Sequence, residues 1–464
     1  MRTLTSLLFL LLCLGTRAAN DFDSIPLFRY RITLRDKDNN TYSVDKPEQF
    51  LSNKAIERRR RHNIAIDEED LPLSQTYVDD IAGRGFKVIS GSKWNNTLLV
   101  SSTDSTLIDD VRNLDYVTDI TCVGEWIYKT HHHDKAKRRN NIKTHNDSVP
   151  DNGTYGAAFF QIRQLNGIPL HNSGYRGDGM TIAIIDGGFL NADVIPAFKN
   201  TRIAGTKDMV GIGDDIFQEH RHGMQVLSCI GMNDRYRFVG TAPEASFWLI
   251  RSEETNGEQA VEEDNWAAAV EFADSVGADI INSSLGYSKF QNDEMSVKYH
   301  ELDGKTHLIS RTASKIASKG MILCNSAGND GNKTWKKIGV PADANDILTV
   351  GAVSMTGTIA TFSSVGDTQD HRVKPDICAM GVNACVMSPG GTLTTANGTS
   401  FSSPILTGLV ACLWQALPNL NAYQIMDAIR QSGNSYEHPN NVYGYGIPDF
   451  QKAYNIGKEI MERQ

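Results

Sequence analysis

Four polar residues in this chain, Asp186, His222, Asn329 and Ser400, are of the types that acyl-transfer chemistry needs. A serine hydroxyl is a weak nucleophile at neutral pH, so it requires a base that takes its proton and a group that orients the base. Imidazole is the usual general base near pH 7, and a carboxamide is a neutral donor suited to a developing oxyanion. We therefore interpret Ser400 as a nucleophile with His222 as its base. Asp186 would orient the imidazole, and Asn329 would line the oxyanion hole.

Each of these residues lies at the end or the start of an apolar segment. Asp186 follows the β-branched run 181–185 (TIAII), and Asn329 follows another apolar run (MILCNSAG). Continuous apolar runs of this length are typical of buried parallel strands, so both side chains are predicted at the carboxyl end of a strand. His222 and Ser400 each precede an apolar pattern with helical spacing. Two strand ends and two helix starts are therefore the elements predicted to position the chemistry.

Strands and helices are predicted to alternate from residue 155 onward. Predicted strands cover residues 181–186, 247–251, 279–283, 321–325 and 347–353, and predicted helices cover residues 258–276, 306–319, 400–417 and 421–432. This rhythm predicts the α/β class, with a mainly parallel, doubly wound sheet covered by helices on both faces. Active sites of such sheets form at the carboxyl ends of the strands, where Asp186 and Asn329 fall.

Residues 20–125 are predicted to form a separate small α+β domain that carries no catalytic constellation. Predicted strands cover residues 28–34, 86–90, 96–101 and 116–123, and predicted helices cover residues 47–62, 74–84 and 104–114. Four consecutive arginines, 58–61, fall within the first of these helices. We expect them to be solvated charges on its outer face and not a processing site.

The composition of the remaining segments indicates their roles. Residues 1–19 have the basic start, apolar core and small residues of a signal peptide, so we expect an exported protein, extracellular or periplasmic. Residues 126–154 are polar and lack periodicity, which predicts an exposed linker. The triplet His131-His132-His133 in this linker is not expected to bind a metal, because three consecutive side chains on a regular element cannot all face one ion. A domain over 155–456 and a short tail over 457–464 complete the division.

The order Asp, His, Ser, with Asn between His and Ser, resembles that of the subtilisin family of serine peptidases, or subtilases. The matching segments are Asp186, His222-Gly223, residues 283–286 (SSLG), residues 326–329 (SAGN) and residues 398–404 (GTSFSSP), which together span most of residues 155–456. Gly187 stands where the family commonly has serine or threonine, and Phe401-Ser402 where it commonly has methionine and alanine. These departures flank the chemistry without removing it.

The resemblance implies a secreted serine endopeptidase of the bacterial type that hydrolyses extended polypeptides. It also implies that residues 20–125 are a propeptide, which helps the peptidase domain to fold and acts as an intramolecular inhibitor until maturation in the linker. The residues implied to bind substrate are Ser284, Leu285 and Gly286, which would pair with it as an added strand, and Ser326, Ala327 and Gly328, which would form one wall of the primary specificity pocket.

Composition sets the outer limits of function. The chain has 464 residues, of which 40% are apolar and 22% charged, and a formal net charge of -9. A length of this order allows a large core and two or three domains. The acidic balance, without a long basic stripe, argues against a nucleic-acid partner. After the amino-terminal segment, the sequence contains no run of 18 apolar residues, which is the length needed to span a membrane.

Several points stay open at the level of the sequence. No cofactor is assigned; calcium often stabilises the subtilases, but no metal ligands are identified in this chain. Cys378 and Cys385 flank a turn-like segment and are equally compatible with a disulfide and with two free thiols. The same triad would also serve an esterase or a peptide ligase, depending on whether water or an amine captures the acyl-enzyme. A catalytically inactive secreted binding protein is the alternative outside enzymes.

Overall fold

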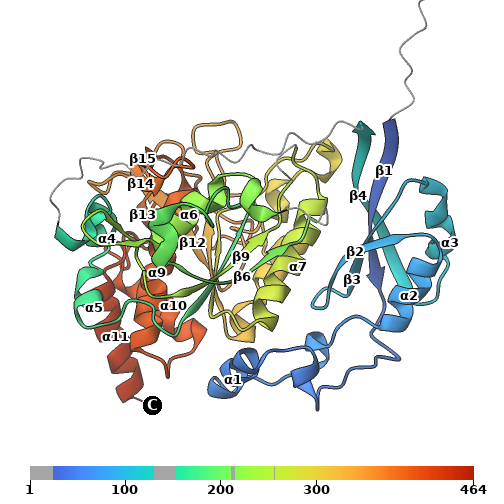
Figure 1. Ribbon diagram of the computed structural model, residues 1–464, viewed down its shortest axis with the longest axis horizontal. Helices are drawn as coiled ribbons and strands as arrows, with labels where there is room; N and C mark the ends of the chain where they lie inside the picture. Colours follow the sequence, from blue (N-terminus) through green and yellow to red (C-terminus); the bar gives the residue numbers. More distant parts are fainter. Residues whose placement is uncertain (1–23, 130–152, 211–214, 255–256, 464) are drawn as a thin grey trace, which may run out of the picture.

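The computed structural model describes residues 24–129, 153–210, 215–254 and 257–463. Figure 1 shows two units side by side: an N-terminal domain (residues 24–129) with a small twisted sheet, and a C-terminal domain (residues 153–463) with a larger sheet between helices. The predicted signal peptide, the histidine triplet and most of the predicted linker lie outside the described residues.

The N-terminal domain is built on a four-stranded antiparallel sheet with the order β2-β3-β1-β4. Its elements are β1 (Ser24–Leu34), α1 (Asn53–Arg61), α2 (Gln75–Gly83), β2 (Lys87–Ser92), β3 (Thr97–Ser102), α3 (Ile108–Arg112) and β4 (Val117–Lys129). Successive side chains of a strand point to opposite faces. On β3, Leu98 and Val100 therefore pack with Ile81 of α2, whereas Leu99 joins the core of the C-terminal domain.

The C-terminal domain contains a seven-stranded sheet in which all the strands pair in parallel. In spatial order its strands are β13 (Ile377–Met380), β12 (Leu348–Val353), β11 (Ile322–Ser326), β10 (Ile280–Ser283), β5 (Thr181–Asp186), β9 (Ser246–Arg251) and β6 (Arg202–Asp208). Its α-helices are α4 (Phe159–Gln164), α5 (Ile168–Asn172), α6 (His222–Gly231), α7 (Val261–Ser275), α8 (Leu308–Ala313), α9 (Thr399–Ala416), α10 (Ala422–Ser432) and α11 (Phe450–Glu462). Two short hairpins, β7 (Asn233–Asp234) with β8 (Phe238–Val239) and β14 (Ala384–Met387) with β15 (Leu393–Ala396), complete it.

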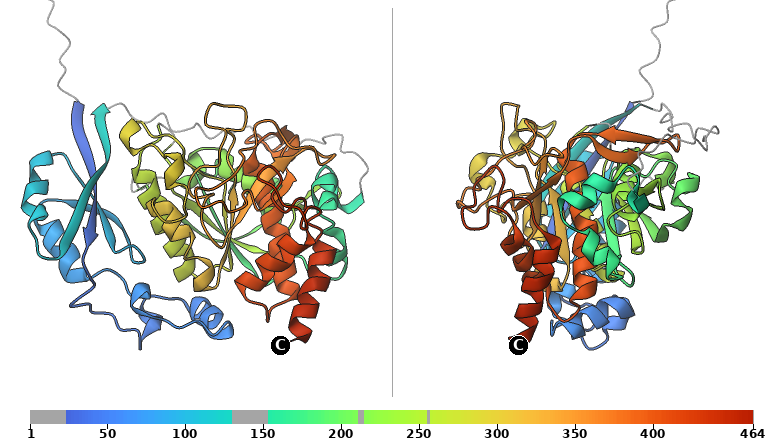
Figure 2. Two further views of the ribbon diagram at one scale, coloured as in Figure 1. Left: turned by 180° about the vertical axis from the view of Figure 1, so that it is seen from behind. Right: turned by 90° about the vertical axis from the view of Figure 1, so that its left-hand side faces the viewer.

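Helices cover both faces of this sheet, as the predicted class requires (Figures 1 and 2). On β5, Ile182 and Ile184 face a core that includes α6 and α9. Ala183 and Ile185 face a second core that includes α7 and α8. Because both faces of the strand are buried, its sequence is continuously apolar and does not alternate.

The sheet changes its winding direction between β5 and β10. From β5 the chain builds β6 and β9 on one side, then crosses to the other side for β10, β11, β12 and β13. Ligands of open parallel sheets bind at such a switch point, outside the carboxyl ends of the strands. Asp186 is the last residue of β5 and therefore lies at this point.

The buried helix α9 contains Pro404, a residue that cannot donate a backbone hydrogen bond. The carbonyl of Ser400, four residues earlier, consequently lacks its intrahelical donor. The hydroxyl of Ser284 donates to this carbonyl at 2.9 Å and replaces the missing amide. The proline thus links the first turn of α9 to the segment that follows β10.

The predicted helix over 306–319 is interrupted in the structure. The α-helix α8 covers Leu308–Ala313, and a separate 3₁₀ turn covers Ala317–Lys319. The Ser314 hydroxyl donates to the carbonyls of Ser310 and Gly304, each at 2.9 Å. Such side-chain bonds compete with the helical backbone pattern, which explains why the helix does not continue.

Two predicted boundaries also differ. The tail expected over 457–464 is helical as far as Glu462, because Gly457 is buried and Ile460 and Met461 pack against the core. At the other end of the chain, β4 continues beyond residue 125 to Lys129, where it pairs with Ser24 of β1. The strands β6 and β13 and the hairpin β14–β15 were not predicted.

Replacing Ser284 by Ala should lower the free energy of unfolding by about 1–3 kcal/mol, since the Ser400 carbonyl would be left buried without a donor. In a chain that also carries Pro404→Ala, residue 404 regains its amide, and the loss caused by Ser284→Ala should be smaller by about 1 kcal/mol. Urea unfolding in a Ser400→Ala background, which lacks the predicted nucleophile, measures this difference. Ser288→Ala serves as the control, and equal losses in both backgrounds would show that the hydroxyl does not replace the amide.

Candidate active site

A carboxylate and an imidazole meet at the carboxyl end of β5. Asp186 is fully buried, and its two oxygens both lie 2.9 Å from Nδ1 of His222, the first residue of α6. The backbone N–H of Gly187 also donates to Asp186, at 2.8 Å. A side chain at Gly223 would bring its Cβ within 2.8 Å of the Asp186 Cβ and 2.6 Å of the Gly188 carbonyl oxygen. Glycine at position 223 therefore allows α6 to approach the strand end closely enough for this pair to form.

Two opposing effects set the basicity of His222. Burial lowers its pKa, while the charge of Asp186 and the hydrogen bond to it raise the pKa; the net result is a pKa above the ordinary value for histidine. The other ring nitrogen, Nε2, remains for a second partner. His222 can therefore accept a proton at Nε2 while Asp186 holds Nδ1–H.

Ser400 lies in the first turn of α9, close to this pair. Its side chain is 8% exposed, and the ring of the adjacent Phe401 lies 5.8 Å from the His222 ring, centroid to centroid. Among the hydrogen bonds of the described residues, the Ser400 hydroxyl donates to the Ser284 carbonyl at 3.4 Å and not to His222. Hydrogen bonds of catalytic groups are often long or differently directed before substrate binds.

Asn329 is held in one orientation by the start of α9. Its Oδ1 accepts hydrogen bonds from the backbone N–H of Thr399 at 2.9 Å and from the Thr399 hydroxyl at 3.1 Å. The carboxamide nitrogen consequently points away from these donors, and the residue is exposed. Gly328, with φ of 103°, supplies the left-handed turn before it.

A cavity of about 190 Å³ lies between the segments that follow β10 and β11 and the start of α9, and neither Asp186 nor His222 lines it. Ser400, Asn329 and all six residues that the sequence implied as substrate-binding residues line it. The remaining lining residues were not predicted from sequence: Tyr287, Ser288, Asp330, Lys333, Gly339 and Ala342. The signal for Asp330 was its position after Asn329, and it forms an ion pair with Lys333 at 2.8 Å. Gly339 and Ala342 lie in the long segment between β11 and β12 and have no polar side chain, so no chemical pattern marked them.

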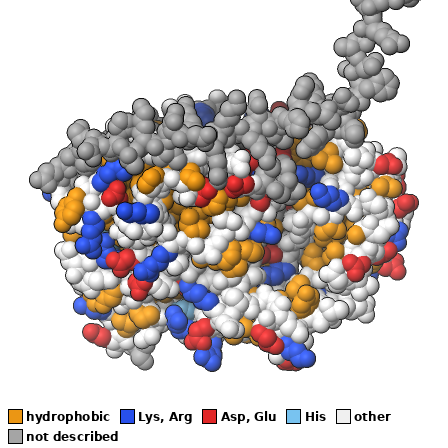
Figure 3. Space-filling view, in the orientation of Figure 1, with side chains coloured by type: hydrophobic (Ala, Val, Ile, Leu, Met, Phe, Trp, Pro, Cys, Tyr) orange, Lys and Arg blue, Asp and Glu red, His pale blue; other side chains and the backbone are white. Residues whose placement is uncertain are grey.

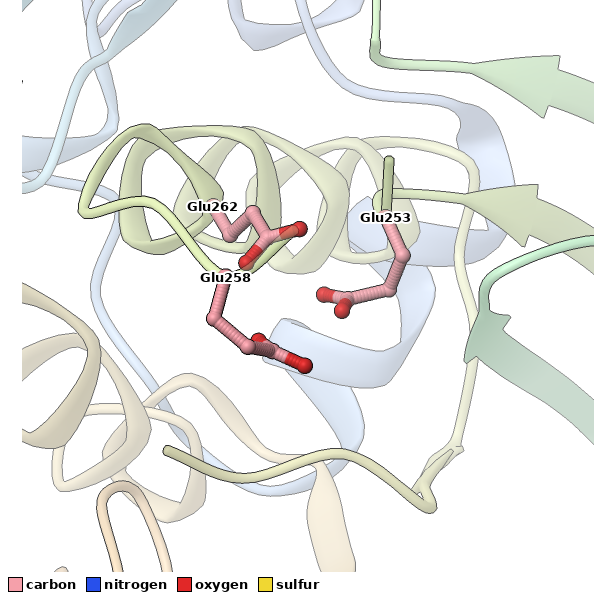
Figure 4. Close-up of side chains that lie close together, drawn as sticks. All are labelled: Glu253, Glu258 and Glu262. Carbon is pink, nitrogen blue, oxygen red and sulfur yellow. The ribbon is translucent and has the colours of Figure 1, made fainter. Parts of the chain in front are cut away.

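Three glutamates converge beside this site (Figure 4). Carboxylate oxygens of Glu253, Glu258 and Glu262 lie within 4.8 Å of one another. Glu253 follows Ser252, whose backbone N–H donates to the Asp186 carbonyl at 3.0 Å, and it accepts a hydrogen bond from the Tyr287 hydroxyl. The cluster therefore flanks both the end of β5 and residues 284–286, which precede Tyr287.

Burial and mutual repulsion keep part of this cluster neutral. They raise the pKa of Glu253 to about 8 and that of Glu262 to about 11. Glu258 is exposed, and Oε1 of Glu262 is buried without a hydrogen-bond partner. Calcium takes carboxylate oxygens of this kind as ligands, so these three glutamates are the residues of the described chain that could hold such a cation, in place of the protons.

The cysteines take no part in the candidate site. All six cysteines of the described residues are free thiols, so the disulfide between Cys378 and Cys385 that the sequence left open is not formed. Burial raises the pKa of the Cys378 thiol to about 12, and its Sγ donates to the Tyr443 carbonyl at 3.5 Å.

Comparisons with known proteins define the class to which this fold and site belong. Residues 177–446, more than half of the chain, match the model of the subtilase family, and residues 29–158 match a peptidase S8 propeptide domain of Bacteroidota. The chain therefore belongs to the subtilase family of serine peptidases and carries a propeptide domain of that family. The family and the α/β fold inferred from the sequence are confirmed.

Individual relatives agree with this assignment. The chain is 28% identical over 302 residues to subtilisin NAT of Bacillus subtilis subsp. natto and, over the same length, to subtilisin E of Bacillus subtilis (strain 168). Each alignment covers 63% of this chain and 70% of the relative. The solved structure of the self-cleaved protease domain of PatA has a TM-score of 0.50 at 23% identity, covers 61% of this chain and 98% of that domain, and shows the shared fold. In the part of the chain that the structure describes, no helix has the length and hydropathy to cross a membrane.

Glu262→Gln should remove a pH-dependent loss of stability. Because the pKa of Glu262 is raised above its ordinary value of 4.5, the folded chain keeps a proton that the unfolded chain releases. Stability is therefore full below pH 4.5 and decreases as the pH rises toward the folded pKa, by about 1.4 kcal/mol per pH unit. Glutamine has the shape of glutamate but cannot ionise. The free energy of unfolding of Glu262→Gln should therefore lack the pH dependence that Glu262 causes.

Urea unfolding at pH 5, 6.5 and 8, in a Ser400→Ala background with a chelator present, measures the slope. Glu57→Gln, at an exposed position of α1, is the matched control and should behave as the parent chain. Parallel pH profiles for Glu262→Gln and its parent would show that Glu262 is not the protonated group.

Proposed function

We propose that this chain is an exported serine endopeptidase, synthesised as a zymogen, that cleaves extended polypeptides with Asp186, His222 and Ser400. The observation that carries the proposal is the hydrogen bond between half-buried His222 and fully buried Asp186, together with a cavity lined by Ser400 and Asn329. Membership of the subtilase family supports the reaction class.

The mechanism follows from the position and charge of each group. The Ser400 hydroxyl turns from the Ser284 carbonyl to Nε2 of His222, loses its proton to that nitrogen and attacks the scissile carbonyl. The imidazolium that forms is stabilised by the Asp186 carboxylate, which accepts a hydrogen bond from Nδ1–H. His222 then gives the proton to the leaving amine, and water repeats the sequence on the acyl-enzyme.

The tetrahedral intermediate places a negative charge on the former carbonyl oxygen. The carboxamide nitrogen of Asn329 and the backbone N–H of Ser400 are the donors proposed to hold it. Thr399 fixes Oδ1 of Asn329 by two hydrogen bonds, so the nitrogen of the same group needs no reorganisation when the charge develops. Preorganised donors of this kind stabilise a transition state more than a ground state.

Substrate contacts are proposed along two edges of the cavity. Gly286 is exposed beside Leu285 at the cavity, where an extended peptide can add as a strand and bond through its main chain. Ser326, Ala327 and Gly328 are small and leave room for the side chain before the scissile bond. The ion pair of Asp330 with Lys333 adds charge to the same cavity.

Latency and export complete the proposal. The N-terminal domain packs directly against α7 of the C-terminal domain, with Leu99 and Val123 in a shared core, which suits an intramolecular inhibitor. The signal-peptide pattern of residues 1–19 supports an extracellular or periplasmic location. Maturation is proposed within residues 126–154.

A fluorophosphonate probe tests the proposed chemistry, because it labels only a serine that a base has activated. The matured wild-type protein should be labelled on Ser400, as located by peptide mapping, and should cleave an unfolded protein. Ser400→Ala should abolish both results, and a chain with Ser403→Ala, one turn along α9, should retain the label. Labelling of another residue would contradict the proposal, and hydrolysis of esters without cleavage of peptides would identify an esterase.

The pH dependence of kcat/KM should follow His222. The base acts in its neutral form, so the rate falls on the acid side, with a midpoint above the ordinary value of about 6.5 because Asp186 raises the pKa. Asp186→Asn removes that attraction and leaves the effect of burial, so the midpoint should move to lower pH while kcat drops roughly 10⁴-fold. Asp178→Asn, which alters an exposed ion pair with Arg202, is the control. A midpoint that stays in place in Asp186→Asn would exclude His222 as the titrating base.

A further inference from the structure

The helix that carries the candidate base begins at the base itself. α6 starts at His222, so the backbone N–H of His222 is one of the first N–H groups of the helix, which have no acceptor within it. Helices usually satisfy such a group with the side chain of a serine, threonine, aspartate or asparagine. The residue before α6, Arg221, forms no capping hydrogen bond with its side chain. The first turn of α6 therefore needs acceptors from other residues.

Two neighbouring residues supply these acceptors. The backbone N–H of His222 donates to Nδ1 of His220 at 3.3 Å, and the N–H of Gly223 donates to the Gly188 carbonyl at 3.0 Å. The His220 ring also lies beside the His222 ring, with 6.2 Å between the centroids and 30° between the planes. The side chain of His220 thus contacts both the backbone and the imidazole of the candidate base.

The backbone around His220 is held in place on both sides. Its carbonyl accepts a hydrogen bond from the N–H of Leu190 at 3.3 Å. A Cβ at Gly188 would collide with the backbone nitrogen of His220, so glycine allows the loop after β5 to lie against this segment. Glu219, which precedes His220, forms an ion pair with Arg251 of β9 at 3.4 Å. His220 is exposed, but its position at the start of α6 is fixed.

The hydrogen bond to Nδ1 forms in only one protonation state of His220. Neutral imidazole carries one proton, and with that proton on Nε2 the lone pair of Nδ1 can accept a hydrogen bond. Protonated imidazole carries a proton on both nitrogens and accepts none. Protonation of His220 therefore breaks its bond to the backbone of His222 and leaves two donors facing each other.

The groups near the His220 ring oppose its protonation. Burial and then the charge of His222 lower the pKa of His220, and Arg221 lowers it further; Asp186 raises it, but the net pKa is below the ordinary value of 6.5. The loop 187–190 that packs against this segment carries no titratable side chain. His222 has the opposite shift, because Asp186 outweighs the effect of burial on its pKa. The two rings therefore take up protons in sequence, His222 first.

Distant charges do not change this order. Acidic and basic side chains are interspersed among the described residues of the face in Figure 3. Salt screens exposed charges that lie more than about 10 Å apart. The contacts of His220 with its immediate neighbours consequently decide when it loses the hydrogen bond.

We propose that His220 is a positioning residue for the reaction: in its neutral form it holds the first turn of α6, and with it the imidazole of His222, in place to accept the proton of Ser400. The inference rests on the proposed function, since it assigns His220 to the general base of that reaction. Protonation of His220 releases the first turn, so a chain with protonated His220 is inactive even where His222 is neutral. Activity is therefore lost in two steps as the pH falls.

The first test is the pH dependence of kcat/KM of the matured protein on a short chromogenic peptide. Below the midpoint of His222, kcat/KM should fall about tenfold per pH unit, and below the midpoint of His220 about a hundredfold per pH unit. His220→Asn, whose Oδ1 can accept the same N–H, should keep a slope of about tenfold throughout, because asparagine does not titrate. His300→Asn, at an exposed position outside the site, is the control and should follow the parent.

The second test separates kcat from KM at pH 8. His220→Ala should lower kcat about tenfold with little change in KM, since a displaced base impairs the chemical step and not substrate binding. His220→Asn should recover most of that loss. Circular dichroism of each chain over the same pH range distinguishes loss of folding from displacement of the base.

NMR spectroscopy of the complete chain with Ser400→Ala and isotope-labelled histidine tests the contact without any need for activity. The His220 signals, identified by their absence in His220→Asn, should show the proton on Nε2 at pH 8. A proton on Nδ1 would overturn the proposal. So would a single slope of about tenfold per pH unit in the parent, or a hundredfold slope that persists in His220→Asn. Absence of peptidase activity in every chain would instead disprove the proposed function, and with it the role of His220, whatever the tautomer.

Discussion

The constraint on which the rest of this structure depends is a parallel sheet that is buried on both faces. With both faces covered by helices, the polar groups of the strands can reach solvent and substrate only at the sheet edges. All strands of the sheet run in the same direction, so their carboxyl ends lie on one side of the sheet. Asp186 ends β5, Ser284 follows β10 and Asn329 lies shortly after β11, while α6 and α9 add His222 and Ser400. Strand direction and the starts of two helices therefore bring the candidate catalytic residues together from distant parts of the sequence.

Burial of charge has three different outcomes in this molecule, and the neighbours decide which one occurs. Asp274 is surrounded by three cations and stays ionised with a pKa of about 2. Glu253 and Glu262 have other carboxylates as neighbours, so burial prevails and their pKa values rise. His222 is intermediate, because Asp186 restores a basicity that burial would remove. An imidazole whose pKa is raised from an ordinary value near 6.5 exchanges a proton near neutral pH, as a general base requires.

Sequence patterns predicted the elements that a continuous apolar run marks, and they missed the features that depend on contacts between distant residues. The strands β5, β9, β10, β11 and β12 were predicted because a buried parallel strand is continuously apolar. The edge strand β6 was missed because its residues alternate between exposed and partly buried, without a clean apolar run. The Asp186–His222 contact agrees with the spacing of known motifs, whereas no sequence pattern marks the hydrogen bond from the Ser400 hydroxyl to the Ser284 carbonyl.

The arginine run 58–61 shows the same limit. The sequence predicts that all four arginines are solvated, but Arg58 and Arg59 are only 3% and 1% exposed. A helix rich in arginine is ordinarily solvated, and nothing within residues 58–61 distinguishes Arg59 from Arg60. The difference comes from Asp70 and Asp274, which lie 11 and 215 residues away from Arg59 in the sequence. Long-range ion pairs of this kind leave no periodic signature, so they cannot be predicted from a single sequence.

The location of these ion pairs also constrains how latency can be built. An inhibitor held only at the carboxyl edge of the sheet would have to be released by the same contacts that substrates compete for. In this chain the buried ion pair of Arg58 with Asp274 lies at the carboxyl end of α7, next to the amino ends of β5 and β10. Among the described residues, none of the candidate active site lies there. Within the described residues, these ion pairs between the domains therefore share no side chain with the candidate active site, so a substitution in one set leaves the contacts of the other set in place.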